Sequence, residues 1–159
     1  MTDNNTYLLL KSLHIVGAVI FLGNIIVTGW WKVMADRTRD PVVVAFAQRQ
    51  VTLTDFVFTA LGAALLLGTG IANATLHGMD YIKIRWLAWG FWLFVASGVL
   101  WVAVLIPVQI KQAKLARQFA HGGIIPNEYW TLGRVWIAVG LIATLLPLAG
   151  VYWMVFKPA

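Results

Sequence analysis

The sequence predicts an all-α fold: an integral membrane four-helix bundle with both termini on the outer side of the membrane. Composition is the first observation, because 60% of the 159 residues are hydrophobic, only 11% are charged and the mean hydropathy is +0.79. These values exclude an ordinary soluble domain. The second observation is four apolar stretches long enough to cross a hydrocarbon core of about 30 Å. The third is the distribution of Lys and Arg, which sets the orientation.

The four predicted spans belong to a single transmembrane domain that covers residues 1–159. Lipid offers the backbone no hydrogen-bond partners, so each span has to be helical. Only the first span carries charged residues. The spans cover about residues 7–31, 56–76, 86–110 and 135–156.

A helical extension is predicted on the inner side, between the first two spans, at about residues 41–55. Asp40 can cap a helix, Pro41 suits its first turn, and no further Gly or Pro occurs before Asp55. Because this segment precedes the second span, we expect its polar residues, including Gln48 and Asp55, to lie in water or among headgroups. The third span is also expected to continue as a helix, into the segment KQAKLARQFAH.

The orientation follows from the basic residues. Four of the twelve Lys and Arg residues fall on the side of the termini and eight on the other side. Basic residues favour the cytoplasmic side of a membrane, so both termini are predicted to be periplasmic, in a bacterial-type inner membrane. Small residues are expected to let the helices approach closely, with Ala60, Ala64 and Gly68 forming a stripe on the second span and Gly62 and Gly70 nearby.

Several kinds of chemistry are excluded. The chain has no cysteine, which removes disulfides, iron–sulfur clusters and thiol nucleophiles. Its basic residues mark the ends of apolar runs and form no continuous face, which argues against nucleic acid and favours membrane lipids as partners. All carboxylates lie in or near loops, so no buried carboxylate is expected. Whether the protein is an enzyme, and whether it pairs with other membrane subunits or with itself, stays open.

The ionisable residues of the outer side suggest a cofactor site. The segment YLLLKSLHIVGAVIFLGN places Lys11 and His14 one turn apart, and the external loop adds His77, Lys83 and Arg85. A neutral imidazole can ligate haem iron and cations can hold haem propionates. The structural alternative is that the histidine forms a hydrogen bond across a helix interface and that the cations bind lipid phosphate. A second axial ligand is open among His77, Met79 and Met154.

Two resemblances add to this pattern. Over nearly its whole length, including ADR, DP, FAQR and the final FKP, the chain resembles an uncharacterised family of predicted bacterial integral membrane proteins. LLLKSLHIVGAVIFLGN also resembles the first helix of the haem-binding four-helix membrane protoporphyrinogen oxidases and of the copper-resistance D membrane domain. The oxidase resemblance implies His14 as a haem ligand, and GMDYIKIRW matches Lys83 to a functionally important lysine. The expected further histidine is absent from LAWGFWLFVASG.

We therefore expect a haem b or related tetrapyrrole site in the outer leaflet, used for electron transfer or tetrapyrrole handling. His14 would ligate the metal, with Lys11, Lys83 and Arg85 near the propionates. A non-catalytic accessory or scaffold subunit of a larger membrane complex is the main alternative. A small-molecule or ion transporter is a third reading.

Overall fold

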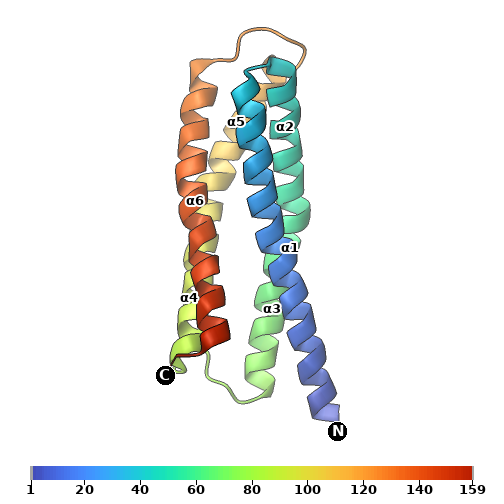
Figure 1. Cartoon of the computed structure of the whole chain (residues 1–159), viewed down its shortest axis with the longest axis vertical. Coiled ribbons are helices and arrows are strands. Elements are labelled where there is room, and N and C mark those ends of the chain that lie inside the picture. Colours follow the sequence, from blue (N-terminus) through green and yellow to red (C-terminus); the bar gives the residue numbers. More distant parts are fainter. Residues whose placement is uncertain (1, 159) are drawn as a thin grey trace.

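A computed structural model describes residues 2–158, with side chains from residue 4 onward, and residues 1 and 159 of the predicted domain lie outside this range. Every regular element of the described chain is helical, as predicted (Figure 1). In order, the elements are α1 (Thr2–Thr38), α2 (Pro41–Thr54), the π-helix η1 (Asp55–Thr59), α3 (Ala60–Leu76), α4 (Arg85–Leu100), the π-helix η2 (Trp101–Leu105), α5 (Ile106–Gln118) and α6 (Asn127–Phe156).

These elements join into four long helical rods, each apolar and long enough to cross a membrane. The first rod is α1, the second runs through α2, η1 and α3, the third through α4, η2 and α5, and the fourth is α6. They confirm the predicted four-helix membrane bundle. At 1.5 Å per residue, the 37 residues of α1 extend about 55 Å, well beyond a hydrocarbon core of about 30 Å.

We call the end of the bundle opposite the two termini the basic end, because seven exposed basic residues lie there: Arg37, Arg39, Arg49, Lys111, Lys114, Arg117 and Arg134. The other end, which carries both termini, is called the terminal end (Figure 1). Both predicted helical extensions are confirmed: α2 begins at Pro41, and α5 continues to Gln118. Asp40 caps α2 by accepting hydrogen bonds from the backbone N–H groups of Val42 and Val43.

Glycines let α1 and α3 approach closely. A Cβ atom at Gly17 would lie 2.8 Å from the backbone nitrogen of Leu66, and one at Gly62 would lie 2.8 Å from that of Phe21. Backbone approach of this kind is how helices associate in lipid. Of the small residues predicted to make this contact, Ala64 and Gly68 are exposed, so the prediction is wrong for these two, whereas Gly62 and Gly70 do face α1. The contact follows the face of Gly62 and Gly70, two residues further round the helix.

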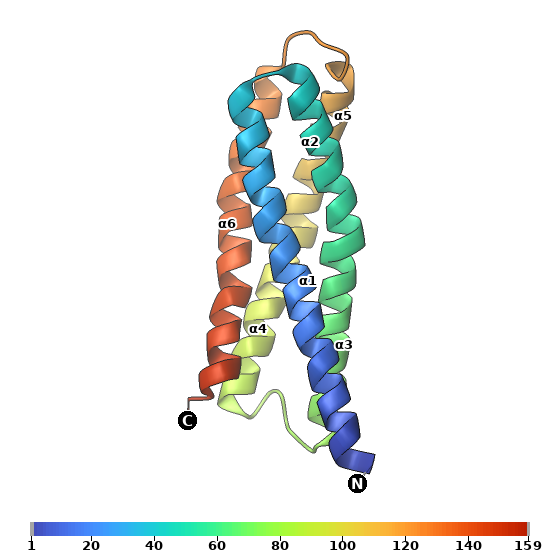
Figure 2. The ribbon, with the colours of Figure 1, turned by 45° about the vertical axis from the view of Figure 1, so that its right-hand side comes forward.

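The bundle is closed at the basic end and open at the terminal end. At the basic end Val44, Ala45, Ala116, Phe119 and Tyr129 form one buried cluster drawn from three rods and a connecting turn. Towards the terminal end, α1 with α3 and α4 with α6 form two separate pairs, since α3 contacts neither α4 nor α6. Figure 2 shows the two pairs diverging downward. The polar interior described below lies where they meet.

Candidate functional site

His14 lies on α1 against α3 and is half-buried. Its Nδ1 atom lies 2.8 Å from the carbonyl oxygen of Leu66, so Nδ1 carries the proton and donates it. Gly70 makes room for the ring, because a Cβ atom there would lie 2.9 Å from His14 Cε1. This bond fixes the tautomer and leaves the Nε2 lone pair available. The arrangement serves equally as a helix–helix contact and as the orientation of a metal-binding imidazole.

Two more of the predicted site residues meet at the terminal end of α1. The ammonium of Lys11 lies 5.7 Å from the centre of the Tyr7 ring, and the His77 ring packs edge-on against the same tyrosine at 5.0 Å. His77 Nδ1 also bonds the carbonyl oxygen of Asn73 at 2.8 Å. Tyr7 therefore links Lys11 and His77 between α1 and α3.

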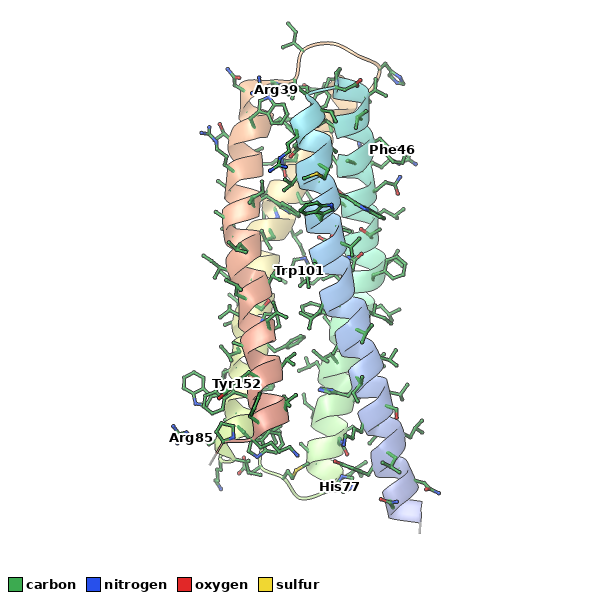
Figure 3. All side chains as sticks on the ribbon, in the orientation of Figure 1. Arg39, Phe46, His77, Arg85, Trp101 and Tyr152 are labelled. Atoms are coloured by element: carbon green, nitrogen blue, oxygen red, sulfur yellow. The ribbon has the colours of Figure 1, made fainter. Side chains whose placement is uncertain are left out.

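The remaining predicted cations lie elsewhere. Lys83 pairs with Asp80 in the loop before α4, at 3.4 Å, and the lysine side chain is 86% exposed. Asp80 also accepts hydrogen bonds from the backbone N–H groups of Ile82 and Lys83, which hold the pKa of its carboxyl below the usual range. Arg85 lies at the start of α4, on the opposite side of the bundle from His77 (Figure 3).

Candidate second ligands are also separated from His14. The methyl group of Met154 packs against Gly90, inside the α4–α6 pair. His77 is engaged by Tyr7 and Asn73 as described. The structure thus brings Lys11 and His77 to the same end of α1 as His14, and holds Lys83, Arg85 and Met154 on the α4 side.

A buried carboxylate, Asp55, lies in the interior of the bundle. The prediction that Asp55 and Gln48 are solvated was wrong, since they are 7% and 0% exposed. The prediction that no carboxylate is buried was wrong for the same reason. The physical reason is that α5 packs along α2 and α1 closes the other side, so the helical extension has an interior face of its own.

Neutral donors from three rods hold Asp55. Its Oδ2 atom accepts a hydrogen bond from Gln109 Nε2 at 3.0 Å, and its Oδ1 atom accepts one from the Thr59 hydroxyl at 3.0 Å. Asn24 Nδ2 donates to Thr59 at 2.9 Å and reaches Asp55 Oδ1 at 3.4 Å. No described Lys, Arg or His forms an ion pair with this carboxyl. Asp55 is therefore satisfied by hydrogen bonds and lacks a compensating charge.

Both π-helices lie at the level of Asp55 along the bundle. The N–H of Ala60 bonds the carbonyl of Asp55 in η1, and the N–H of Ile106 bonds the carbonyl of Trp101 in η2, each five residues back. Such π-helical turns are rare and occur often at functional sites. The η2 turn ends at Leu105, two residues before Pro107, which lacks an N–H, so the irregular turn also accommodates the proline. Trp101 lies midway along the bundle in Figure 3.

A cavity of about 850 Å³ lies at the level of η1 and η2 and is lined by residues of all four rods, chiefly α1, α4 with η2, and α6. Its walls are mostly apolar and aromatic, with Asp55, Thr59, Ser97 and Trp101 among the polar contributions. The indole N–H of Trp101 is buried beside the Asp55 carboxyl and interacts with it, without reaching the geometry of a regular hydrogen bond. Among the described residues that line the cavity there is no His, Met or Tyr. The cavity can therefore hold an apolar molecule with a polar head, and its walls offer no axial ligand for haem iron.

A second polar cluster closes the basic end of the interior. The Lys32 ammonium is 3.1 Å from Asp36 Oδ2, donates to the Tyr129 hydroxyl at 2.9 Å and lies 4.9 Å from the centre of that ring. The Tyr129 hydroxyl also lies 3.3 Å from Gln48 Oε1. Because Lys32 and Asp36 neutralise each other, this cluster joins three rods without leaving a net charge.

Comparison with known proteins points to one family. Residues 8–158 match the family described as predicted integral membrane protein (DUF2269). No curated protein and no solved structure matches the chain. The match covers nearly the whole chain and agrees with the four apolar helices. The chain therefore belongs to the DUF2269 family of predicted integral membrane proteins.

Proposed function

We propose that this membrane protein binds a lipid-soluble small molecule in the cavity at the level of η1 and η2, with Asp55 recognising its polar head. One observation carries the proposal: a buried carboxyl, held by neutral donors, lines a largely apolar cavity of about 850 Å³ inside a membrane bundle. Ligand pockets have volumes of this order and combine apolar walls with a few placed polar groups. Burying an ionisable residue inside a membrane bundle costs free energy, so such residues commonly mark functional sites.

Two further features support a ligand at this position. The buried N–H of Trp101 interacts with the Asp55 carboxyl but makes no hydrogen bond of regular geometry, so a ligand acceptor or a water molecule can improve its bonding. The two π-helices η1 and η2 also contribute irregular turns to the cavity lining at the same height along the bundle. Several lining side chains, including Ile26, Val102 and Leu141, are also exposed on the surface of the bundle. A ligand would thus enter sideways from the bilayer.

The glycines of the chain provide a sharp test. A Cβ atom at Gly98 meets nothing within 4 Å, and Gly98 lines the cavity, so Gly98→Leu would fill the cavity without a backbone clash. Gly68 also meets nothing within 4 Å but is exposed and lies outside the cavity lining, so Gly68→Leu is the matched control. Each protein is purified in mild detergent, extracted with organic solvent and analysed by mass spectrometry.

Wild-type protein and the Gly68→Leu variant are expected to retain a defined lipid-soluble molecule, about one per chain, that Gly98→Leu lacks. Equal contents in all three proteins would contradict the proposal. A wild-type protein that carries no such molecule, and is stable only with other subunits, would favour the accessory role instead.

Haem b bound by His14 is a second candidate, favoured by the Nδ1 bond to Leu66, which leaves Nε2 free to ligate iron. The fit is partial. His14 suits the metal, whereas Lys83 is held by Asp80, and Met154 is packed on α4. Visible spectra test it: a Soret band that is lost in His14→Ala, and kept when the exposed loop residue His121 is changed to Ala, would support haem. A colourless wild-type protein that does not take up added haemin would exclude it.

The orientation is also proposed, from the basic residues. Exposed Lys and Arg gather at the basic end, so this end would face the cytoplasm, with both termini in the periplasm of a bacterial-type inner membrane. In this orientation Asp55 lies nearer the cytoplasmic side and His14 nearer the periplasmic side.

A further inference from the structure

We propose that the ligand of the cavity is a lipophilic organic cation, whose positive charge is bound by the Asp55 carboxylate. This inference rests on the proposed function and adds the chemical class of the ligand. It begins from the charges of the bundle interior. Lys32 and Asp36 form a pair 3.1 Å apart and neutralise each other, which leaves Asp55 without a partner of opposite charge among the described residues.

A buried carboxylate without a cation is expensive in a medium of low dielectric constant. Its hydrogen bonds favour the ionised form, because Gln109 and Thr59 place donors on Oδ2 and Oδ1 respectively. The Gln109 N–H can only donate, so it matches an ionised oxygen best, whereas the Thr59 hydroxyl can also accept from a protonated carboxyl. A cation that enters the cavity would supply the missing charge and offset the cost of ionising Asp55.

The cavity walls suit an organic cation with aromatic or alkyl groups. The rings of Phe21, Phe94, Trp101 and Trp136 line the cavity, and aromatic faces attract cations strongly where water is excluded. This chain already uses that interaction, since the Lys32 ammonium lies 5.8 Å from the centre of the Trp136 ring. A metal ion is a poorer occupant, because no group of three or more potential metal ligands occurs among the described residues.

A proton competes with such a cation for Asp55, so binding should weaken as the pH falls. The groups that face Asp55 from the neighbouring elements do not titrate in the accessible range. They are Asn24 from α1, Thr59 from η1, Trp101 from η2 and Gln109 from α5. The nearest charged groups on the basic side of the cavity, Lys32 and Asp36, compensate each other.

Two ions of equal size and opposite charge test the inference. Tetraphenylphosphonium and tetraphenylborate are measured by equilibrium dialysis against protein in mild detergent, with detergent alone as the blank. The variants are Asp55→Asn, Gly98→Leu and Glu128→Gln, the last being an exposed acid that serves as the matched control. Asp55→Glu retains the charge, and tests the site if Asp55→Asn does not fold.

Wild-type protein should bind tetraphenylphosphonium about tenfold or more tightly than tetraphenylborate. Asp55→Asn and Gly98→Leu should remove this preference, whereas Asp55→Glu and Glu128→Gln should keep it. Because tetraphenylphosphonium does not titrate, binding that weakens at low pH in the wild type and in Glu128→Gln, but not in Asp55→Asn, would be assigned to Asp55.

Two outcomes overturn the inference in different ways. If both ions bind equally and Gly98→Leu abolishes both, the cavity binds ligands but the cationic class is wrong. If neither ion binds, the cationic class is again wrong, and the organic extraction of wild-type and Gly98→Leu protein decides separately whether the cavity holds a ligand. Cation binding that survives Gly98→Leu would place the cation site outside the cavity and overturn the cationic class, and the same extraction would again decide whether the cavity holds a ligand.

Discussion

The side-chain amide of Gln109 donates a hydrogen bond to the carboxylate of Asp55, with Nε2 and Oδ2 3.0 Å apart. This bond joins two rods that meet in the interior of the bundle, and both side chains are buried, at 3% and 7% exposure. The pair therefore contributes to stability and also sets the position of the carboxyl in the cavity.

Replacing Gln109 by Met should therefore destabilise the protein. The change keeps the volume but removes a donor to a charged group, at a cost of about 2 kcal/mol in the free energy of unfolding. Gln118→Met, at an exposed position on the same helix, should have little effect. Unfolding in mixed detergent micelles, followed by circular dichroism, compares the two. Equal stability of both variants would mean that the Asp55–Gln109 bond does not hold the rods.

Lys32→Met should be more damaging, because it leaves the carboxylate of Asp36 without its partner. Lys32 is fully buried and also donates to Tyr129, so the expected loss is about 3 kcal/mol. The double variant Lys32→Met/Asp36→Leu should recover part of this loss, since it removes both charges. Lys114→Met, at an exposed site, is the control. A double variant no more stable than Lys32→Met alone would argue against the ion pair as the cause.

Gly62→Val tests the close approach of α1 and α3. The added Cβ atom would lie 2.8 Å from the backbone nitrogen of Phe21, so one helix has to move, at a cost of about 2 kcal/mol. Gly68→Val lies on the same helix with nothing within 4 Å, and carries the same penalty for a branched residue. The same unfolding measurement should separate the two variants. A similar loss in both would show that intrinsic helix preference, and not the contact, is responsible.

The orientation can be tested with single cysteines, because the native chain has none. Ile82 and Ile124 are exposed in the loops at the terminal end and the basic end, at 60% and 93%. In intact cells, a membrane-impermeant maleimide should label Ile82→Cys and should reach Ile124→Cys only after permeabilisation. The reverse pattern would place the termini in the cytoplasm.

Hydropathy and capping residues were enough to predict the four helices, the start of α2 at Pro41 and the continuation of the third span into α5. These features depend on local composition, which lipid makes decisive. The polar interior was missed because Asp55 was expected to be solvated from its position near the charged loop, and the helix face on which it lies was not considered. Its depth depends on α5 packing along α2, a contact between segments far apart in the chain.

A signal for this interior is nevertheless present in the sequence. Asn24, Thr28, Lys32 and Asp36 recur every four residues on α1, and Gln48, Thr52, Asp55 and Thr59 follow a helical period on the next rod. Polar stripes of this kind inside long apolar helices indicate a face turned towards other helices. The positions of Lys83 and Arg85 relative to His14, in contrast, depend on how far the two helix pairs diverge, which no local pattern encodes.

The most direct test of the central claim is photocrosslinking inside the cavity. Benzoylphenylalanine in place of Phe94, which lines the cavity, is compared with the same residue in place of Phe56, which is 57% exposed on the outer surface. After irradiation in native membranes, intact-mass spectrometry should show one defined adduct at position 94 and a mixture of membrane lipids at position 56. The same lipid mixture at both positions would show that the cavity holds no specific ligand, and would contradict the account.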